Sequence, residues 1–183
     1  MYSRFKTLCG PYSRFYTDTL FSKVTPLRGN TCGQVFYNKA RFYKFYPLKR
    51  KQEVHTTLLP LFELAGIPSG MHSNRVPELI TGSFASVLQK YKIRGTTTEP
   101  NIPQQNRAEG EGIKPAKKLG SWLLHQTGAP LRLGDYAFEW AAQILSLTCK
   151  LHLIFGERTG FEVFTQTRPD ISEYTSFTFY FWI

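Results

Sequence analysis

Cysteine is scarce in this chain. Its 183 residues include only Cys9, Cys32 and Cys149, which stand far apart. There is no CxxC pair and no cluster of cysteine with histidine, which argues against a structural zinc site. An odd number of cysteines without a signal peptide favours a reducing compartment. No apolar run approaches the roughly 20 residues that a membrane-spanning helix needs, so we expect no membrane association.

Acidic residues are also few. The chain has 13 Asp and Glu against 23 Lys and Arg, a net charge of +10. Such a surplus favours a polyanionic partner, most often nucleic acid. Residues 36–51 hold six bases and no acid: Lys39, Arg41, Lys44, Lys49, Arg50 and Lys51. We expect this stretch and the basic stretch of residues 90–118 to attract DNA through phosphate contacts.

Apolar periodicity predicts a mixed α/β layout. Strands are expected at residues 15–24, 31–37, 41–48, 69–73 and 93–98, with a hairpin connection at 38–40. Helices are expected at residues 52–65, 83–92, 106–126 and 134–148. We expect Pro60 to kink the first of these helices, and Gly110, Gly112 and Pro115 to loosen the third. The tail from residue 155 onward is expected to be extended.

The predicted strand at residues 41–48 interleaves aromatic and basic side chains. The pattern fits either a surface for stacking bases and holding phosphates or a core strand with a solvated basic face. The core interpretation agrees better with where aromatic residues usually lie.

Three polar stations could bring oxygen ligands together. They are Asp18 on the first strand, Asn74 in the turn MHSNRVPE, and Glu109 at the start of the third helix. Divalent ions held by hard oxygen ligands support phosphodiester cleavage and transfer. Each station also has an ordinary explanation. Asp18 suits a surface or turn position, Asn74 suits a turn, and Glu109 and Glu111 suit a helix N-terminus.

In the order and spacing of several uncommon blocks, the chain resembles the integrase catalytic core of copia-like (Ty1/copia superfamily) retrotransposon polyproteins, which are retroviral-type integrases. The blocks are YTDTLFSKVTPLRGNTCGQVF, FYPLKRK, GIPSGMHSNRVPEL, TTTEPNIPQQNRAE and GERTGFEVFTQTRPDISEY. The resemblance implies an RNase H-like fold with a five-stranded mixed sheet flanked by helices. It also implies Mg²⁺- or Mn²⁺-dependent processing of element-end DNA and its transfer into target DNA, in the nucleus.

The three acids of that family fall on Asp18, Asn74 and Glu109, the last two 35 positions apart. The resemblance therefore implies Asp18 and Glu109 as metal ligands and all three as catalytic positions. Because Asn74 offers a neutral amide where the family has a carboxylate, we expect impaired catalysis. Residues near the third acid are expected to contact DNA: Gln105, Asn106, Arg107, Lys114, Lys117 and Lys118.

The same resemblance divides the chain into a leader (1–15), a catalytic core-like domain (16–150) and an aromatic extension of the core (151–183). Three interpretations stay open: an active strand-transfer enzyme that tolerates Asn74, a non-enzymatic nucleic-acid binder, and a remnant without selected function. A homo-oligomer is compatible with each of them.

Overall fold

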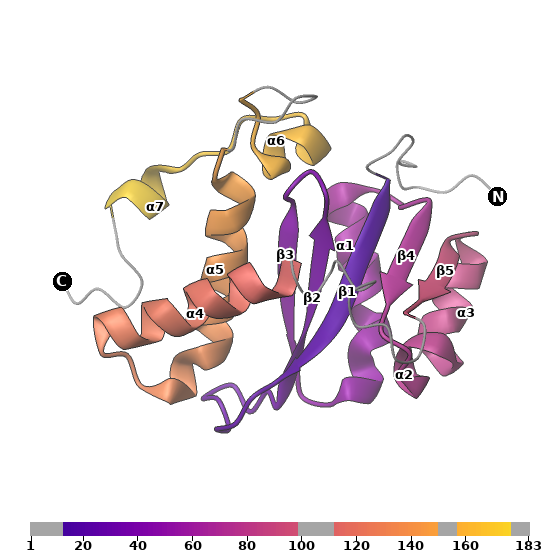
Figure 1. The fold of residues 1–183 in the computed structure, drawn as a ribbon, viewed down its shortest axis with the longest axis horizontal. Helices are drawn as coiled ribbons and strands as arrows, with labels where there is room; N and C mark the ends of the chain where they lie inside the picture. The colour runs from indigo at the N-terminus through magenta and orange to yellow at the C-terminus, as the bar shows by residue number, and fades with distance from the viewer. Residues whose placement is uncertain (1–12, 99–111, 150–156, 177–183) are drawn as a thin grey trace.

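The computed structural model describes residues 13–98, 112–149 and 157–176 of the chain. Its centre is a five-stranded mixed sheet in the order β3-β2-β1-β4-β5, with helices on both faces (Figure 1). This confirms the expected RNase H-like fold, and the meander followed by crossover connections can be followed along the chain.

The first three strands form an antiparallel meander: β1 (Arg14–Phe21), β2 (Cys32–Asn38) and β3 (Tyr43–Leu48). The predicted hairpin joins β2 to β3. The Asn38 side chain accepts a hydrogen bond from the backbone N–H of Ala40 (2.8 Å), and Arg41 takes a left-handed conformation with φ of 64°. Asparagine stabilises such turns because its side chain mimics a backbone hydrogen bond.

Two parallel strands complete the sheet. β4 (Gly70–Ser73) pairs with β1, and β5 (Arg94–Thr97) pairs with β4. The connections to them carry a 3₁₀ helix (η1, Lys51–Thr57), α1 (Leu58–Ala65), the short α2 (Pro77–Ile80) and α3 (Gly82–Lys90). Parallel strands require crossover connections of this kind.

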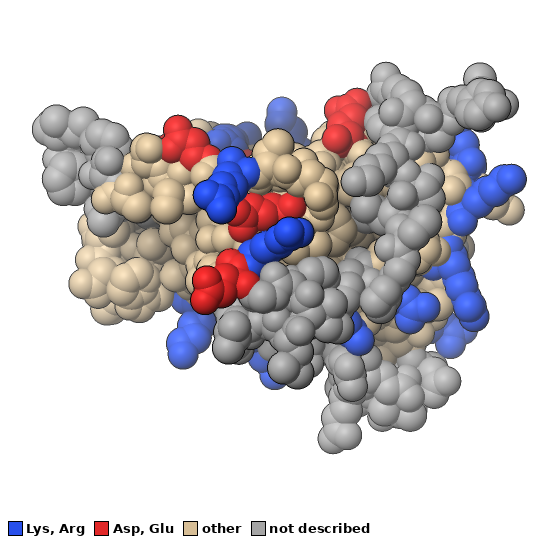
Figure 2. Space-filling model, turned by 90° about the horizontal axis from the view of Figure 1, so that it is seen from above, with Lys and Arg blue, Asp and Glu red and all other residues tan. Residues whose placement is uncertain are grey.

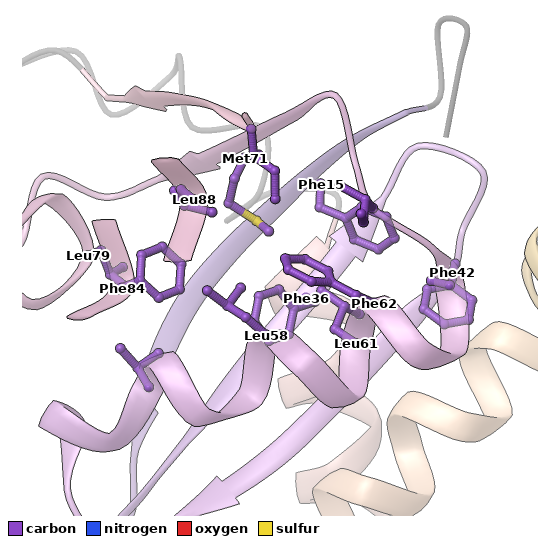
Figure 3. Packing of buried hydrophobic residues seen from close by; sticks show 14 of the residues in the cluster. Phe15, Phe36, Phe42, Leu58, Leu61, Phe62, Met71, Leu79, Phe84 and Leu88 are labelled. Carbon is purple, nitrogen blue, oxygen red and sulfur yellow. The ribbon is translucent and has the colours of Figure 1, made fainter. Parts of the chain in front are cut away.

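The larger hydrophobic core lies between these helices and one face of the sheet. Leu58, Leu61 and Phe62 of α1 pack against Phe15 and Phe36 of the sheet, with Met71, Phe84 and Leu88 beside them (Figure 3). Val54, Leu58, Leu61, Phe62 and Ala65, the predicted apolar face of residues 52–65, are all buried.

The opposite face of the sheet is covered by α4 (Lys114–Thr127) and α5 (Gly134–Leu147), which are joined through a 3₁₀ turn (η4, Leu131–Leu133). α5 packs against β3, whereas α4 packs mainly against α5 and reaches the sheet at its start (Figure 1). Tyr37, Tyr43 and Phe45 are buried beneath them. The aromatic residues of the 41–48 stretch therefore belong to the core, as the second interpretation of that stretch expected.

The expected kink at Pro60 is wrong. The chain switches from 3₁₀ to α-helix at Leu58, so Pro60 lies in the first turn of α1. The first-turn backbone N–H groups of a helix have no partner within the helix, and proline is tolerated there.

The expectations for two later segments also need correction. The described part of the third helix is α4, which begins at Lys114 with Pro115 in its first turn, where proline is tolerated. Residues 106–111 lie outside the described residues. The tail is not extended throughout, because it forms α6 (Gly160–Thr165) and α7 (Ser172–Ser176). A capping box between Thr159 and Glu162 starts α6. In the described part of the chain, no helix combines the length and apolar character of a membrane span.

We predict that Ser146→Ala lowers the free energy of unfolding by about 1–3 kcal/mol, because a buried N–H loses its acceptor. The buried Ser146 hydroxyl accepts a hydrogen bond from the backbone N–H of Tyr43 on edge strand β3 (2.7 Å). Urea unfolding measures the change. The matched control is Thr148→Ala, which removes an exposed hydroxyl near the same helix end and should cost less than about 0.5 kcal/mol. Equal losses in the two variants would contradict the proposed anchoring of β3 by α5.

Candidate active site

The parallel pairing of β1 with β4 places two of the predicted site residues side by side. Thr17 is in register with Ser73, so the next residues, Asp18 and Asn74, lie next to each other on the face that carries α4 and α5. Asn74 Nδ2 donates a hydrogen bond to Asp18 Oδ1 (2.9 Å), which also accepts one from the backbone N–H of Thr19 (2.9 Å). Both side chains are half-buried.

The orientation of the Asn74 amide follows from its two neighbours. A carboxylate only accepts hydrogen bonds, so the amide turns its nitrogen toward Asp18. Its oxygen then faces the Thr98 hydroxyl, which donates to it at 3.5 Å. Asn74 therefore connects Asp18 on β1 to Thr98, the residue that follows β5.

A histidine extends this network across the sheet. His72 Nδ1 lies 3.0 Å from the Thr96 hydroxyl, and Nε2 lies 3.3 Å from the Thr98 hydroxyl. The Tyr16 ring packs edge-on against the imidazole, with ring centroids 5.6 Å apart. Burial, followed by the positive charge of Arg14, lowers the pKa of His72 below its usual value. The neutral imidazole is therefore the favoured form.

The other predicted site residues fall into two groups. Glu109, Gln105, Asn106 and Arg107 lie outside the described residues. Three lysines, Lys114, Lys117 and Lys118, are exposed in the first turns of α4. Ile113, directly before that helix, is buried in the cluster that contains Tyr16. The start of α4 therefore packs on the sheet face that carries Asp18.

Sequence reasoning missed the polar neighbours of this pair. His72, Thr96 and Thr98 alternate along β4 and β5 on the same face as Asp18 and Asn74. Side chains two positions apart on a strand share a face. The spacing of these residues can be seen in the sequence. Their contacts with one another can be inferred only when it is known which strands are neighbours.

The described ligand set does not fit a magnesium ion in this arrangement. Mg²⁺ takes oxygen ligands, usually including one or two carboxylates. Here Asn74 presents N–H to Asp18, so the space between them is spanned by a hydrogen bond. Among the described residues, no three His, Cys, Asp or Glu side chains gather closely enough to hold a metal ion.

Comparison with solved structures relates this fold to viral integrases. The HTLV-2 integrase catalytic core domain in complex with magnesium matches with a TM-score of 0.61 at 16% identity, over 84% of this chain and 97% of that one. The BIV integrase catalytic core domain matches with a TM-score of 0.61 at 17% identity, over 90% and 98%. A simian T-cell lymphotropic virus intasome in complex with PP2A regulatory subunit B56 gamma matches with a TM-score of 0.68 at 18% identity, over 91% and 59%.

No protein-family model and no curated protein matches the chain. The structural matches establish the fold: this chain has the fold of a retroviral integrase catalytic core. Asp18 and Asn74 lie together on one face of that fold, beside the strand end where β4 leads into a turn.

We predict that the pKa of His72, followed by NMR, lies below the ordinary value for histidine of about 6.5, and that Arg14→Gln raises it only in part, because burial is the larger cause. A histidine with a lowered folded-state pKa takes up protons on unfolding. Its contribution to stability is therefore present above the unfolded-state pKa of about 6.5 and is lost as pH falls through the folded-state value. A His72 pKa at or above about 6.5 would contradict the buried, neutral imidazole.

Proposed function

We propose that this chain is an integrase core-like, DNA-binding domain derived from a copia-like retrotransposon, and that Asn74 impairs its metal-dependent end processing and strand transfer. The observation that carries the proposal is the 2.9 Å contact between Asn74 and Asp18, within the integrase core fold. DNA that is to receive an insertion lies in the nucleus, so a nuclear location belongs to the same proposal.

The chemistry of the pair supports impairment. When bound, a divalent ion in such a site activates the attacking oxygen and stabilises charge on the leaving oxygen. An amide carries no negative charge, and in its present orientation it donates to Asp18. Binding an ion between the two side chains would require the Asn74 amide to turn and would lose its hydrogen bond to Asp18. We expect metal affinity to be weak for both reasons. The magnesium in the HTLV-2 core supports the expectation that a full acid set would restore it.

The charge distribution supports DNA as partner. The chain carries a net charge of +10. Seen from above, basic side chains gather over β5 and α3, whereas the visible acidic ones lie toward the centre and the side of α5 to α7 (Figure 2). With Lys114, Lys117 and Lys118 exposed on α4, several described bases can contact phosphates. A homo-oligomer is supported by the trimeric and dimeric forms of the HTLV-2 core.

We predict that Asn74→Asp lowers stability in EDTA by about 1–3 kcal/mol, because two facing carboxylates replace a hydrogen-bonded pair. Saturating Mg²⁺ should raise the Tm of this variant, since the ion binds the folded state alone. Thermal unfolding with and without Mg²⁺ measures both effects. Asn74→Ser, which loses the hydrogen bond but adds no charge, is the control and should not respond to Mg²⁺. A wild-type Tm that rises with Mg²⁺ as much as that of Asn74→Asp would contradict the poor fit of the amide.

A strand-transfer assay tests the catalytic half of the proposal. We predict that Asn74→Asp joins a labelled oligonucleotide to target DNA at least about 100-fold faster than the wild type, because several kcal/mol of charge stabilisation are regained. Adding Asp18→Asn to that variant should abolish the activity. Equal activity of wild type and Asn74→Asp would show that the amide is tolerated. Inactivity of both, with DNA binding retained, would favour the second candidate function, a non-enzymatic nucleic-acid binder.

A further inference from the structure

Two arginines flank a glycine on the same sheet face as Asp18. Arg14 on β1 is in register with Gly70 on β4, and Gly70 is in register with Arg94 on β5. Residues in register on neighbouring strands share a face, and neighbouring strands lie about 4.8 Å apart, so the two arginine Cα atoms are about 10 Å apart. Tyr16, His72 and Thr96 form the next row, and Asp18 and Asn74 lie one row further on.

The Arg14 side chain lies next to the space that a side chain at residue 70 would fill. A Cβ atom added at residue 70 would stand 3.3 Å from Arg14 Nε and 3.7 Å from its Cγ. The same atom would stand 3.3 Å from the carbonyl oxygen of Arg94. The Arg14 side chain therefore leans across the glycine toward β5. A Cβ atom at position 70 would require the Arg14 side chain to shift by a few tenths of an ångström.

Both arginines are exposed, and the ion pairs among the described residues involve neither of them. The register places both arginines on one face with a single glycine between them, and the Arg14 side chain leans toward β5. The positive charge of Arg14 also lowers the pKa of His72 in the next row, as a nearby cation does. Among the described ion pairs, the row Arg14–Gly70–Arg94 thus presents two forked donors that no carboxylate binds.

We propose that Arg14 and Arg94 together hold one phosphate of a nucleic-acid strand that crosses β1, β4 and β5 beside the Asp18–Asn74 pair. This inference rests on the proposed function, and it adds a phosphate site that the sequence did not indicate. Guanidinium matches phosphate oxygens with two parallel hydrogen bonds, which a single lysine cannot do.

The experiment measures the affinity of the full chain for a fluorescent oligonucleotide as a function of salt. Arg14→Gln and Arg94→Gln should each weaken binding and reduce the slope of log K against log[salt] by about 0.7 for a single strand or about 0.9 for a duplex, the loss of one phosphate contact. The control is Arg168→Gln, which removes the same charge from a side chain that is 95% exposed between α6 and α7. It should leave the slope unchanged.

A double variant tests whether one phosphate is shared. If it is, Arg14→Gln with Arg94→Gln should reduce the slope no further than either single change, because the same contact is lost once. Additive reductions would show two separate phosphate contacts and would overturn the shared site. Unfolding curves of each variant confirm that the fold is kept, since both side chains are exposed.

The remaining outcomes separate this inference from the proposed function. If the wild type binds DNA with a steep salt dependence while the Arg14 and Arg94 variants behave like Arg168→Gln, only the arginine site is overturned. If the wild type shows no salt-dependent binding, DNA binding itself fails and the arginine site fails with it. The last measurement follows the NMR signals of the arginine Nε–H groups as each ligand is added. Shifts with inorganic phosphate but none with the oligonucleotide would identify a site for free anions and would overturn the strand.

Discussion

The register of β1 against its two neighbours is the constraint on which the site depends. Asp18 meets Asn74 only because Thr17 stands opposite Ser73 in the parallel pair. A shift of one residue would turn every side chain of β1 to the other face of the sheet. The contact between Asp18 and Asn74 would then be lost, and Phe15 would leave the hydrophobic core.

Buried polar groups on the opposite face of β1 hold that register. Gln34 of β2 is completely buried, and its amide donates to the Thr17 hydroxyl while its carbonyl accepts from the Thr19 hydroxyl (2.7 Å). Thr17 in turn donates to the carbonyl oxygen of Val35 (2.8 Å). A slipped register would leave the Gln34 amide buried without partners, which costs about 1–3 kcal/mol for each lost group. The polar side chains on this face of the sheet thus fix the position of Asp18 on the other face.

Most of the fold could be predicted from the sequence, because the strands and helices follow from apolar periodicity, which is a local pattern. It failed where the signal was ambiguous or distant. Pro60 was taken to interrupt a long helix, yet the change from 3₁₀ to α-helix places it where no hydrogen bond is needed. The helical α6 was hidden in an aromatic tail, although Thr159 and Glu162 form a capping pattern that could have revealed it. For the site, Asp18 and Asn74 came from resemblance. His72, Arg14 and Arg94 require knowledge of which strands are neighbours, and a single sequence does not contain it.

The proposed function gives Asn74 the position of a second acid, and an amide at that position changes what the site requires. Two carboxylates at this distance repel each other and are stable together only with a cation or a shared proton. Asn74 removes that requirement, because its amide N–H donates a hydrogen bond to the Asp18 carboxylate. The Asp18 carboxylate accepts hydrogen bonds from Asn74 and from the backbone of Thr19, and the Asn74 hydrogen bond competes with any metal ion. The side chains that we propose to contact phosphate, Arg14, Arg94 and the lysines of α4, are other residues than the Asp18–Asn74 pair. Under the proposed function, attraction to a polyanion and metal-dependent chemistry therefore depend on different side chains, so that a chain with this fold could lose the second while it keeps the first.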